Sequence, residues 1–451
     1  MNLESIMEII IKLIEEKNYS ELKLELRHIR SVDMAYILEE LNERDTLLVF
    51  RLLPKGIAAE VFSYLSTEKQ AELSSLVDEK ELSDILDELF FDDKIDYLEE
   101  MPANVVKKIL KNTSEMERKL INQFLMYPDY SAGSLMTIEF VDLKKEMLAK
   151  DALARIRKIA PDKETIYTCY AIDEERHLEG TVTLKDIVLA GDNVKIENIM
   201  QKNPIYVKTH DDQEDVADIF KKYDLLAVPV VDNEKRLVGI ITIDDVVDVI
   251  EQEATEDFYR MAAVQPSEES YLNTGVFTLA RKRIVWLFVL MISSTLSGFI
   301  IQRYELALKS VVALAVFIPM LMDTGGNAGS QASTVVIRGL VLGEIEIKDI
   351  LKVVWKEARI ASISGVLLAF VNFIRVYFIQ GYSLAISLTV SITIVLTIVV
   401  AKVVGGMLPI IAQKLKLDPA MMASPLITTI VDTTTLAIYF TLAVWIIGIT
   451  V

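Results

Sequence analysis

Apolar residues in the last third of the chain form five long runs that are almost free of charge. The runs are 284–301, 311–337, 360–379, 384–401 and 419–451. Only three charged residues interrupt them: Asp323 in the second run, Arg375 in the third and Asp432 in the fifth. Since a helix needs about 20 apolar residues to cross about 30 Å of hydrocarbon, the pattern predicts an α-helical membrane domain of five spans over 281–451.

Lysine and arginine residues flank these runs on one predicted side of the membrane. They precede the first run at Arg281, Lys282 and Arg283, and they recur between the second and third runs and between the fourth and fifth. Because cytoplasmic loops carry an excess of basic residues, we expect a multi-pass protein of the plasma membrane with its N-terminal part in the cytosol and its C-terminus outside. Residues 1–16 contain four glutamates and no secretory signal, which fits this orientation.

Residues 1–130 show the apolar spacing of short amphipathic helices. Ile85, Leu86 and Leu89 are an example of this spacing, and Pro54 and Pro102 punctuate the series. We therefore predict an all-α N-terminal domain in which short helix pairs form a superhelical array.

A weak internal repeat follows, with copies at 131–197 and 198–253. In the second copy, 226–231 and 237–243 are typical of buried strands and 215–222 is typical of a helix. Each copy ends in the pattern Gly-x-x-Thr-x-x-Asp, at Gly180, Thr183 and Asp186 and at Gly239, Thr242 and Asp245. The repeat resembles a tandem pair of CBS domains, which are α+β units of the order β-α-β-β-α.

The resemblance to CBS domains implies a possible nucleotide site. In those domains this pattern often holds an adenosine ribose, so Thr183, Asp186, Thr242 and Asp245 are candidate nucleotide ligands and ATP is a candidate cofactor. The alternative is that each threonine caps a strand-to-helix turn.

An acidic stretch, 244–257, ends the second copy and leads into a predicted connecting helix at 254–280. It contains seven acidic residues and no basic one: Asp244, Asp245, Asp248, Glu251, Glu253, Glu256 and Asp257. Like charges three or four residues apart destabilise a helix, and hard divalent cations prefer carboxylate oxygens. The stretch is therefore either a solvated acidic helix or a place where divalent cations cancel the repulsion.

Charge divides the chain where hydropathy does. The net charge is −19 although the mean hydropathy is +0.34. Residues 281–451 contain 14 basic and 8 acidic residues, a net charge of +6, whereas residues 1–280 contain 33 basic and 58 acidic residues, a net charge of −25. The acidity argues against nucleic acid as a partner, and one cysteine with three scattered histidines excludes a disulfide framework and a multi-cysteine metal site.

Two polar features lie inside the predicted spans. The stretch 323–331 in the second run places Asp323, three glycines, Asn327 and Gln331 at membrane depth. Asp432 lies 13 residues into the fifth run, next to threonines that include Thr428. Intramembrane carboxylates are costly and mark ion pathways, so both features favour a pathway; close helix packing for the glycines and a structural ion pair for Asp432 are the alternatives.

The order of these elements resembles the MgtE family of magnesium channels over essentially the whole chain. The motifs that carry the resemblance are Asp-Asp-Val-Val-Asp at 244–248, Glu-Ala-Thr-Glu-Asp at 253–257, Gly-Gly-Asn at 325–327, Asp-Pro-Ala at 418–420, and Pro425 followed by Asp432. The sequence departs from many relatives at Ser330 and Ser424, where those relatives carry asparagine.

The resemblance implies a homodimer in a lipid bilayer, with the pore on the two-fold axis. Implied pore residues are Asp432, Asn327, Gly325, Gly326 and Thr428, and Asp418 is implied to share a cation with the connecting, or plug, helix. Implied regulatory metal ligands are Glu60, Asp92, Asp96, Asp212, Glu214, Asp224, Asp245, Asp248, Glu253, Glu256 and Asp257.

The sequence is thus expected to encode a non-enzymatic channel that takes up Mg²⁺ and is closed when cytosolic Mg²⁺ binds the acidic domains. Three alternatives stay open: a CBS-regulated channel for Mn²⁺ or Co²⁺, an anion channel, and a membrane-anchored nucleotide sensor. A membrane enzyme is disfavoured because no histidine lies beyond His210 and no cysteine lies in the predicted spans.

Overall fold

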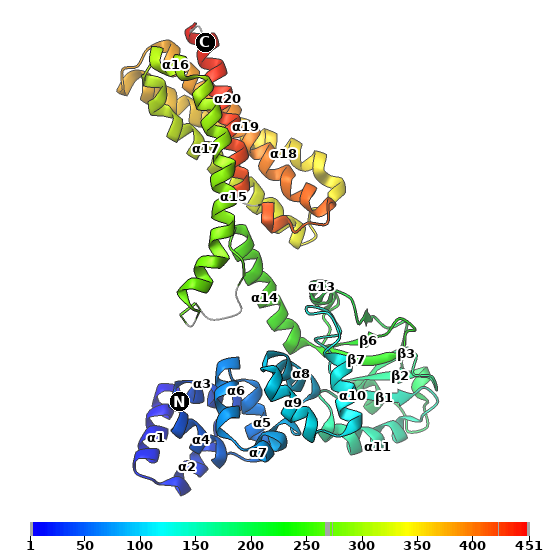
Figure 1. Cartoon of the computed structure of the whole chain (residues 1–451). Helices are drawn as coiled ribbons and strands as arrows, with labels where there is room; N and C mark the ends of the chain where they lie inside the picture. The colour runs from blue at the N-terminus through cyan, green and yellow to red at the C-terminus, as the bar shows by residue number, and fades with distance from the viewer. Residues whose placement is uncertain (1–2, 267–270, 273, 423, 449–451) are drawn as a thin grey trace. The chain divides into compact units, whose positions relative to one another are not determined.

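The structure is a computed structural model that describes residues 3–266, 271–272, 274–422 and 424–448 (Figure 1). The chain divides into two compact units, Met1–Ile250 and Glu251–Val451.

The first unit begins with an array of short helices. They are α1 (Leu3–Glu15), α2 (Tyr19–Leu26), α3 (Ser31–Glu40), α4 (Glu43–Leu52), α5 (Lys55–Ser63), α6 (Thr67–Leu76), α7 (Glu79–Leu86), α8 (Phe91–Glu100), α9 (Ala103–Asn112) and α10 (Glu115–Phe124). Each odd-numbered helix from α1 to α9 packs against the next odd-numbered one, which makes one row. In a second row, α4 packs against α6 and α6 against α8. This two-row packing confirms the predicted superhelical array, which is coloured blue to cyan in Figure 1.

Short polar side chains begin several of these helices. Asn42, Ser66, Asp78 and Ser114 each accept a hydrogen bond from the backbone N–H three residues later. Such caps satisfy N–H groups that a helix leaves without a partner at its start. The chain therefore restarts a helix after each short turn, which keeps the helices short.

Two α+β repeats complete the first unit. The first consists of β1 (Val141–Lys144), α11 (Ala149–Ile159), β2 (Thr168–Ile172), β3 (Leu178–Thr183) and α12 (Leu184–Leu189), with β4 (Gln201–Lys202) at the edge of its sheet. The second consists of β5 (Val207–Lys208), α13 (Gln213–Tyr223), β6 (Ala227–Val231), β7 (Leu237–Thr242) and α14 (Ile243–Met261). In both, the first two strands pair in parallel and the last two antiparallel, so the predicted β-α-β-β-α order is confirmed.

Helix α14 differs from the connecting helix predicted at 254–280. It begins at Ile243 because Val246 and Val249 are buried against the core of the first unit. It ends at Met261, and Ala263 closes the turn with a φ of +54°. The acidic stretch 244–257 therefore lies entirely within one uninterrupted helix. The described residues between Met261 and Val276 lie outside helices.

The second unit contains the apolar helices. They are α15 (Val276–Arg303), the short α16 (Glu305–Ser310), α17 (Ala313–Val341), α18 (Ile350–Ile374), α19 (Leu384–Lys414) and α20 (Ser424–Ile447). Four segments within the described residues are long and apolar enough to cross a membrane: Val276–Arg303, Ile347–Ile379, Leu384–Lys414 and Pro419–Ile447. Helix α17 has 29 residues, but its polar stretch 323–331 makes it less apolar, so the second of the five predicted spans, 311–337, is not confirmed.

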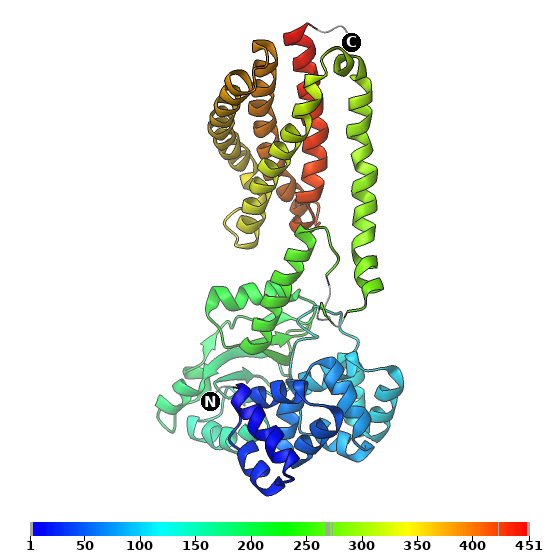
Figure 2. The same cartoon turned by 90° about the vertical axis from the view of Figure 1, so that its left-hand side faces the viewer.

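Glycines bring three of these helices unusually close together. A Cβ atom at Gly405 of α19 would lie 2.2 Å from the Gly329 carbonyl oxygen of α17, and one at Gly329 would lie 2.6 Å from Ile427 Cγ2 of α20. Only a residue without a side chain fits contacts this short. Helices α17, α19 and α20 therefore form the packed centre of the unit, and Figure 2 shows α20, in red, running along this group.

Candidate functional site

Asp432 lies on α20 where this helix packs against the glycines of α17. A Cβ atom at Gly325 would lie 2.8 Å from Val431 Cγ1, and one at Gly326 would lie 2.9 Å from Thr428 Cγ2. Both glycines are buried, and the Thr428 hydroxyl donates a hydrogen bond to the Pro425 carbonyl at 2.9 Å. The structure thus places Gly325, Gly326 and Thr428 in the contact between α17 and α20, where they fix the position of Asp432.

The polar residues of the 323–331 stretch lie on a different side of α17. Asp323, Asn327 and Gln331 follow one another at four-residue spacing, and all three are exposed while the glycines between them are buried. Asp323 lies close enough to Asp432 to interact with it electrostatically. A polar stripe of this kind is poorly tolerated against hydrocarbon, so it needs water or another polar surface. Four-residue spacing was the sequence signal that could have grouped Asp323 with Asn327.

Ser330 and Ser424 are the two positions at which the sequence departs from many relatives. Ser330 donates a hydrogen bond to the Gly326 carbonyl at 2.9 Å, so it is tied to the backbone of its own helix. The side chain of Ser424 lies outside the described residues.

Carboxylates of α14 meet the start of the α20 segment within the second unit. Arg260 pairs with both Glu256 and Asp418, and Asp418 also accepts a hydrogen bond from the Ala420 N–H at 2.7 Å. Burial and the nearby charges of Asp418 and Glu253 raise the pKa of Asp257 to about 6. The structure therefore brings together the predicted residues Glu253, Glu256, Asp257 and Asp418, with an arginine among them.

A second group of carboxylates lies in the first unit, where α8 approaches the start of α14. Burial and then the charge of Asp245 raise the pKa of Asp92 well above its usual value. Burial and then the charge of Asp93 raise the pKa of Asp96 to about 7. Burial, opposed by a hydrogen bond from Thr242, raises the pKa of Asp245 to about 6. We call Asp92, Asp93, Asp96, Asp245 and Glu164 the acidic cluster.

Two members of the acidic cluster were not predicted from the sequence. The pKa of Asp93 is raised to about 6 by burial, and that of Glu164 to about 8 by burial and by Asp244 and Asp245. Asp93 stands beside Asp92 in the sequence, which was a usable signal, whereas nothing near Glu164 marks it. Glu60 is exposed. Besides burial, the charges of Glu60, Asp93 and Asp244 raise the pKa of Tyr64, so Glu60 borders the acidic cluster.

Two of the remaining predicted metal ligands, Asp212 and Asp224, have local structural roles. Asp212 caps α13 by accepting the Glu214 N–H at 2.9 Å, and Asp224 ends the same helix in the left-handed conformation with a φ of +52°. Asp248 lies on α14. Within the described residues, no three histidine, cysteine, aspartate or glutamate side chains are arranged to hold a metal ion. A cation held by these groups therefore needs water ligands or a rearrangement.

The threonines of the repeated Gly-x-x-Thr-x-x-Asp pattern also begin helices. Thr183 accepts the Asp186 N–H at 3.1 Å and donates to the Asp186 carboxylate at 2.6 Å. Thr242 donates to the Asp245 carboxylate at 2.8 Å. The capping interpretation is therefore confirmed for Thr183, and a nucleotide role for these residues stays a prediction.

The raised pKa values predict how the first unit responds to pH when divalent ions are removed. A carboxyl whose pKa is higher in the folded state stabilises that state below pH of about 4, and this stability is lost as the pH rises through the folded pKa. The pKa values of Asp93, Asp96, Asp245 and Glu164, which lie between about 6 and 8, place this loss of stability between about pH 4 and 8. We expect the melting temperature in chelator to fall by several degrees from pH 5.5 to 8, since about 1 kcal/mol corresponds to about 2–4 °C for a unit of this size.

Circular dichroism or differential scanning fluorimetry of the full chain measures this fall. The fall should shrink in the variant Asp92→Asn/Asp245→Asn and persist in Glu8→Gln/Glu15→Gln, which removes two exposed carboxylates of α1. A melting temperature that rises from pH 5.5 to 8 would contradict the assignment.

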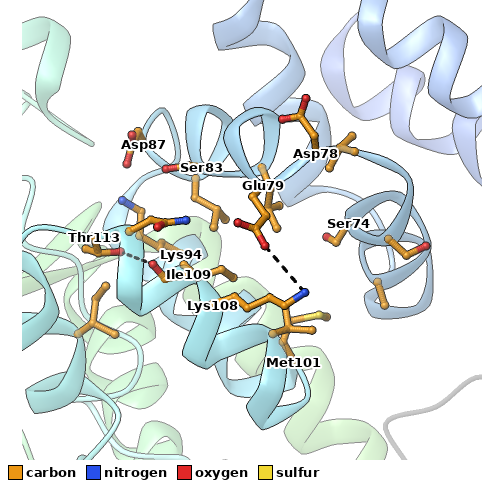
Figure 3. A pocket seen from close by; sticks show the side chains of 18 of the residues that line it. Ser74, Asp78, Glu79, Ser83, Asp87, Lys94, Met101, Lys108, Ile109 and Thr113 are labelled. Carbon is orange, nitrogen blue, oxygen red and sulfur yellow. Dashed lines mark hydrogen bonds and ion pairs between the residues drawn. The ribbon is translucent and has the colours of Figure 1, made fainter.

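A cavity of about 400 Å³ lies elsewhere in the first unit, among α6 to α10 (Figure 3). Its walls are largely apolar, with Leu82, Met101 and Ile109 among them, and Lys108 and Glu79 form an ion pair at 3.9 Å beside it. None of the predicted site residues lines it. By contrast, a smaller polar cavity of about 300 Å³ is lined by Asp93 and Asp96, so solvent reaches the acidic cluster.

Comparisons with known proteins cover the same parts of the chain. Three family models match: the divalent cation transporter model MgtE at residues 318–442, the MgtE intracellular N domain at 29–130, and the CBS domain at 196–252. The magnesium transporter MgtE of Thermus thermophilus is 36% identical over 95% of this chain and 96% of its own length. The magnesium transporter MgtE of Bacillus subtilis is 33% identical over 98% of this chain and 97% of its own length.

Two solved structures resemble the N-terminal half. The soluble part of a magnesium transporter is 29% identical, with a TM-score of 0.53, over 56% of this chain and 100% of that one. The cytosolic domain of the Mg²⁺ channel MgtE in complex with ATP is 36% identical, with a TM-score of 0.51, over 53% of this chain and 98% of that one.

Proposed function

Because this chain belongs to the MgtE family of divalent cation transporters, we propose that it conducts Mg²⁺ into the cell through a pathway lined by Asp432. The observation that carries this proposal is that Asp432 lies near the exposed polar stripe of α17, through Asp323, in a unit that is otherwise built from apolar helices. One carboxylate cannot replace the six waters of Mg²⁺, which dehydrates reluctantly. The ion therefore passes largely hydrated, and Asn327 and Asp323 offer further polar contacts to its water shell.

A homodimer supports this pathway on physical grounds. In the single chain the polar stripe of α17 is exposed and Asp432 is half-buried, and a second copy related by a two-fold axis would place two Asp432 side chains around one channel. A closed polar channel then forms without exposing carboxylates to lipid. The five-span arrangement, with α17 as the span that faces the channel and with the C-terminus outside, is part of the same proposal.

The acidic residues of the cytosolic part support closure by cytosolic Mg²⁺. Burial first, and then the charges of neighbouring carboxylates, raise the pKa values of the acidic cluster, and a divalent cation that bridges these carboxylates offsets both costs of holding them ionised. Ions stabilise the conformation that binds them better. Rising Mg²⁺ thus favours a compact conformation in which α14 closes the channel, and Glu60, Glu253, Glu256, Asp257 and Asp418 contribute to the same response.

ATP is the candidate nucleotide of the CBS pair, since a relative 36% identical binds it in its cytosolic domain. Thr183, Asp186, Thr242 and Asp245 would contact it if the pattern serves here as it does in other CBS domains. The division of the chain at residues 130, 197, 253 and 280 belongs to the same proposal, with helix α14 running across the boundary at 253.

Uptake into liposomes tests the proposed function directly. Purified full-length protein is reconstituted, and entry of Mg²⁺, Mn²⁺, Co²⁺ and Cl⁻ is followed with ion-sensitive dyes. Mg²⁺ uptake above that of protein-free liposomes, and its suppression by Mg²⁺ on the cytosolic side, is the expected result. Uptake of Cl⁻ alone would favour the anion channel, and uptake of no ion would leave only the sensor.

A further inference from the structure

Arg260 occupies the centre of the carboxylate group that α14 forms with Asp418. One guanidinium nitrogen contacts the Asp418 carboxylate, and the other contacts Glu256 on the preceding turn of the same helix. The side chain is 37% exposed, Asp418 is 20% exposed and Glu256 is 23% exposed. These contacts are less screened by solvent than those of a fully exposed pair.

The surroundings of Arg260 are otherwise acidic. Burial lowers the pKa of Arg260, but the hydrogen bond and charge of Asp418, together with Glu256 and Glu253, raise it overall. Burial and Asp418 raise the pKa of Asp257, and the positive charge of Arg260 offsets only part of that rise. From the facing helix, Arg283 lies with Glu251 and Phe258 around a separate cavity of α14. The group centred on Asp418 therefore has one arginine among four carboxylates, with a net charge of −3.

The geometry of these contacts is that of a cation bridge. A guanidinium presents several N–H donors in a planar fork and can serve two carboxylates at once. Here one of the carboxylates belongs to the connecting helix and the other to the segment that precedes α20. Arg260 therefore joins α14 to that segment through ion pairs that need no metal.

We propose that Arg260 is a built-in cation that holds α14 against the Asp418 segment when Mg²⁺ is scarce and that Mg²⁺ must displace to bind there. The proposal rests on the proposed gating by cytosolic Mg²⁺ and specifies how its threshold is set. The chain has three relevant states: released, held by Arg260, and held by Mg²⁺. Because the state held by Arg260 competes with the state held by Mg²⁺, Arg260 raises the Mg²⁺ concentration at which the Mg²⁺-held state is half populated.

The donor set is suitable for Mg²⁺ once the guanidinium has moved. Carboxylate oxygens of Glu256, Asp257 and Asp418 are the ligands that this ion prefers, and water supplies the rest of its octahedron. One arginine stands among four carboxylates, so Arg260 neutralises the group only in part. A doubly charged ion neutralises it further, which provides the driving force for displacement.

Hydrogen–deuterium exchange of peptides covering 251–262 tests the proposal in full-length protein in lipid nanodiscs, titrated with MgCl₂ at constant ionic strength. Arg260→Gln should lose protection in chelator and should reach half of its Mg²⁺-induced protection at a concentration about two- to fivefold lower than wild type, the range that one partly exposed ion pair supplies. Arg260→Lys keeps the positive charge but not the planar fork of N–H donors, so both readouts should lie between those of wild type and Arg260→Gln.

Arg281→Gln is the matched control, because it removes the same charge from an exposed position at the start of α15. If Arg260→Gln behaves like Arg281→Gln in both readouts while wild type responds to Mg²⁺, the proposal is overturned and the gating function stands. If wild type shows no Mg²⁺-dependent protection, the proposed gating falls and this proposal with it. In an Asp418→Asn background the Arg260→Gln change should have no further effect; a full additional shift there would also overturn the proposal.

Discussion

The variant Asp432→Asn is expected to lose Mg²⁺ uptake almost completely. The amide keeps the size of the side chain but removes the charge that attracts the hydrated cation where α17 and α20 meet. Hydrogen bonds to a charged group contribute about 1.5–3 kcal/mol, so we expect the initial rate of uptake into liposomes to fall by at least about tenfold.

Asp349→Asn provides the control for the loss of a carboxylate from the same unit. Asp349 lies at the start of α18, where it accepts from Lys352 at 2.7 Å and from the Glu346 N–H at 3.2 Å. Its replacement should leave the uptake rate near that of wild type. Near-normal uptake by well-folded Asp432→Asn protein would refute the assignment of the pathway to Asp432.

The second large effect is expected from the acidic cluster. In Asp92→Asn/Asp245→Asn the two carboxylates that oppose each other across α8 and α14 become neutral, so Mg²⁺ has no repulsion to relieve between them. The channel should then stay open at internal Mg²⁺ concentrations that close the wild type, and half-inhibition of uptake should shift upward by at least about tenfold.

The charge-matched variant Glu8→Gln/Glu15→Gln separates this effect from a general loss of negative charge. Both residues are exposed on α1, and their replacement should leave the inhibition curve unchanged. Uptake by Asp92→Asn/Asp245→Asn that remains fully inhibited at the wild-type concentration would exclude the cluster from gating. Uptake at low internal Mg²⁺ should be the same in all three proteins, which confirms that the pathway itself is intact.

Several elements of this protein could be predicted from the sequence because they depend on residues only a few positions apart. The helix predicted at 215–222 is α13, and the strand predicted at 237–243 is β7, which ends one residue earlier. The capping role of Thr183 was likewise readable from its spacing to Asp186. The limits of α14 could not be predicted from the sequence, because its start depends on the burial of Val246 and Val249 against segments distant in the sequence.

The glycines of α17 show where sequence patterns reach their limit. Gly325 and Asn327 were predicted to line one pathway, but only the packed structure shows that the glycines contact α20 while Asn327 and Asp323 lie on an exposed side. The positions differ by two residues, which corresponds to about 200° around a helix. Composition at membrane depth identifies the segment, but the packing partner decides which side carries which role.

The sequence by itself determined the two halves of opposite charge, the apolar runs, the repeated α+β unit and the family, since all of these are properties of composition, periodicity and motif order. Only the tertiary structure decided which carboxylates meet. It brings Asp92 to Asp245 and Arg260 to Asp418, residues 153 and 158 positions apart. Electrostatic interactions act through space over a few ångströms, and no local pattern encodes which distant charges the packing of helices will bring within that range.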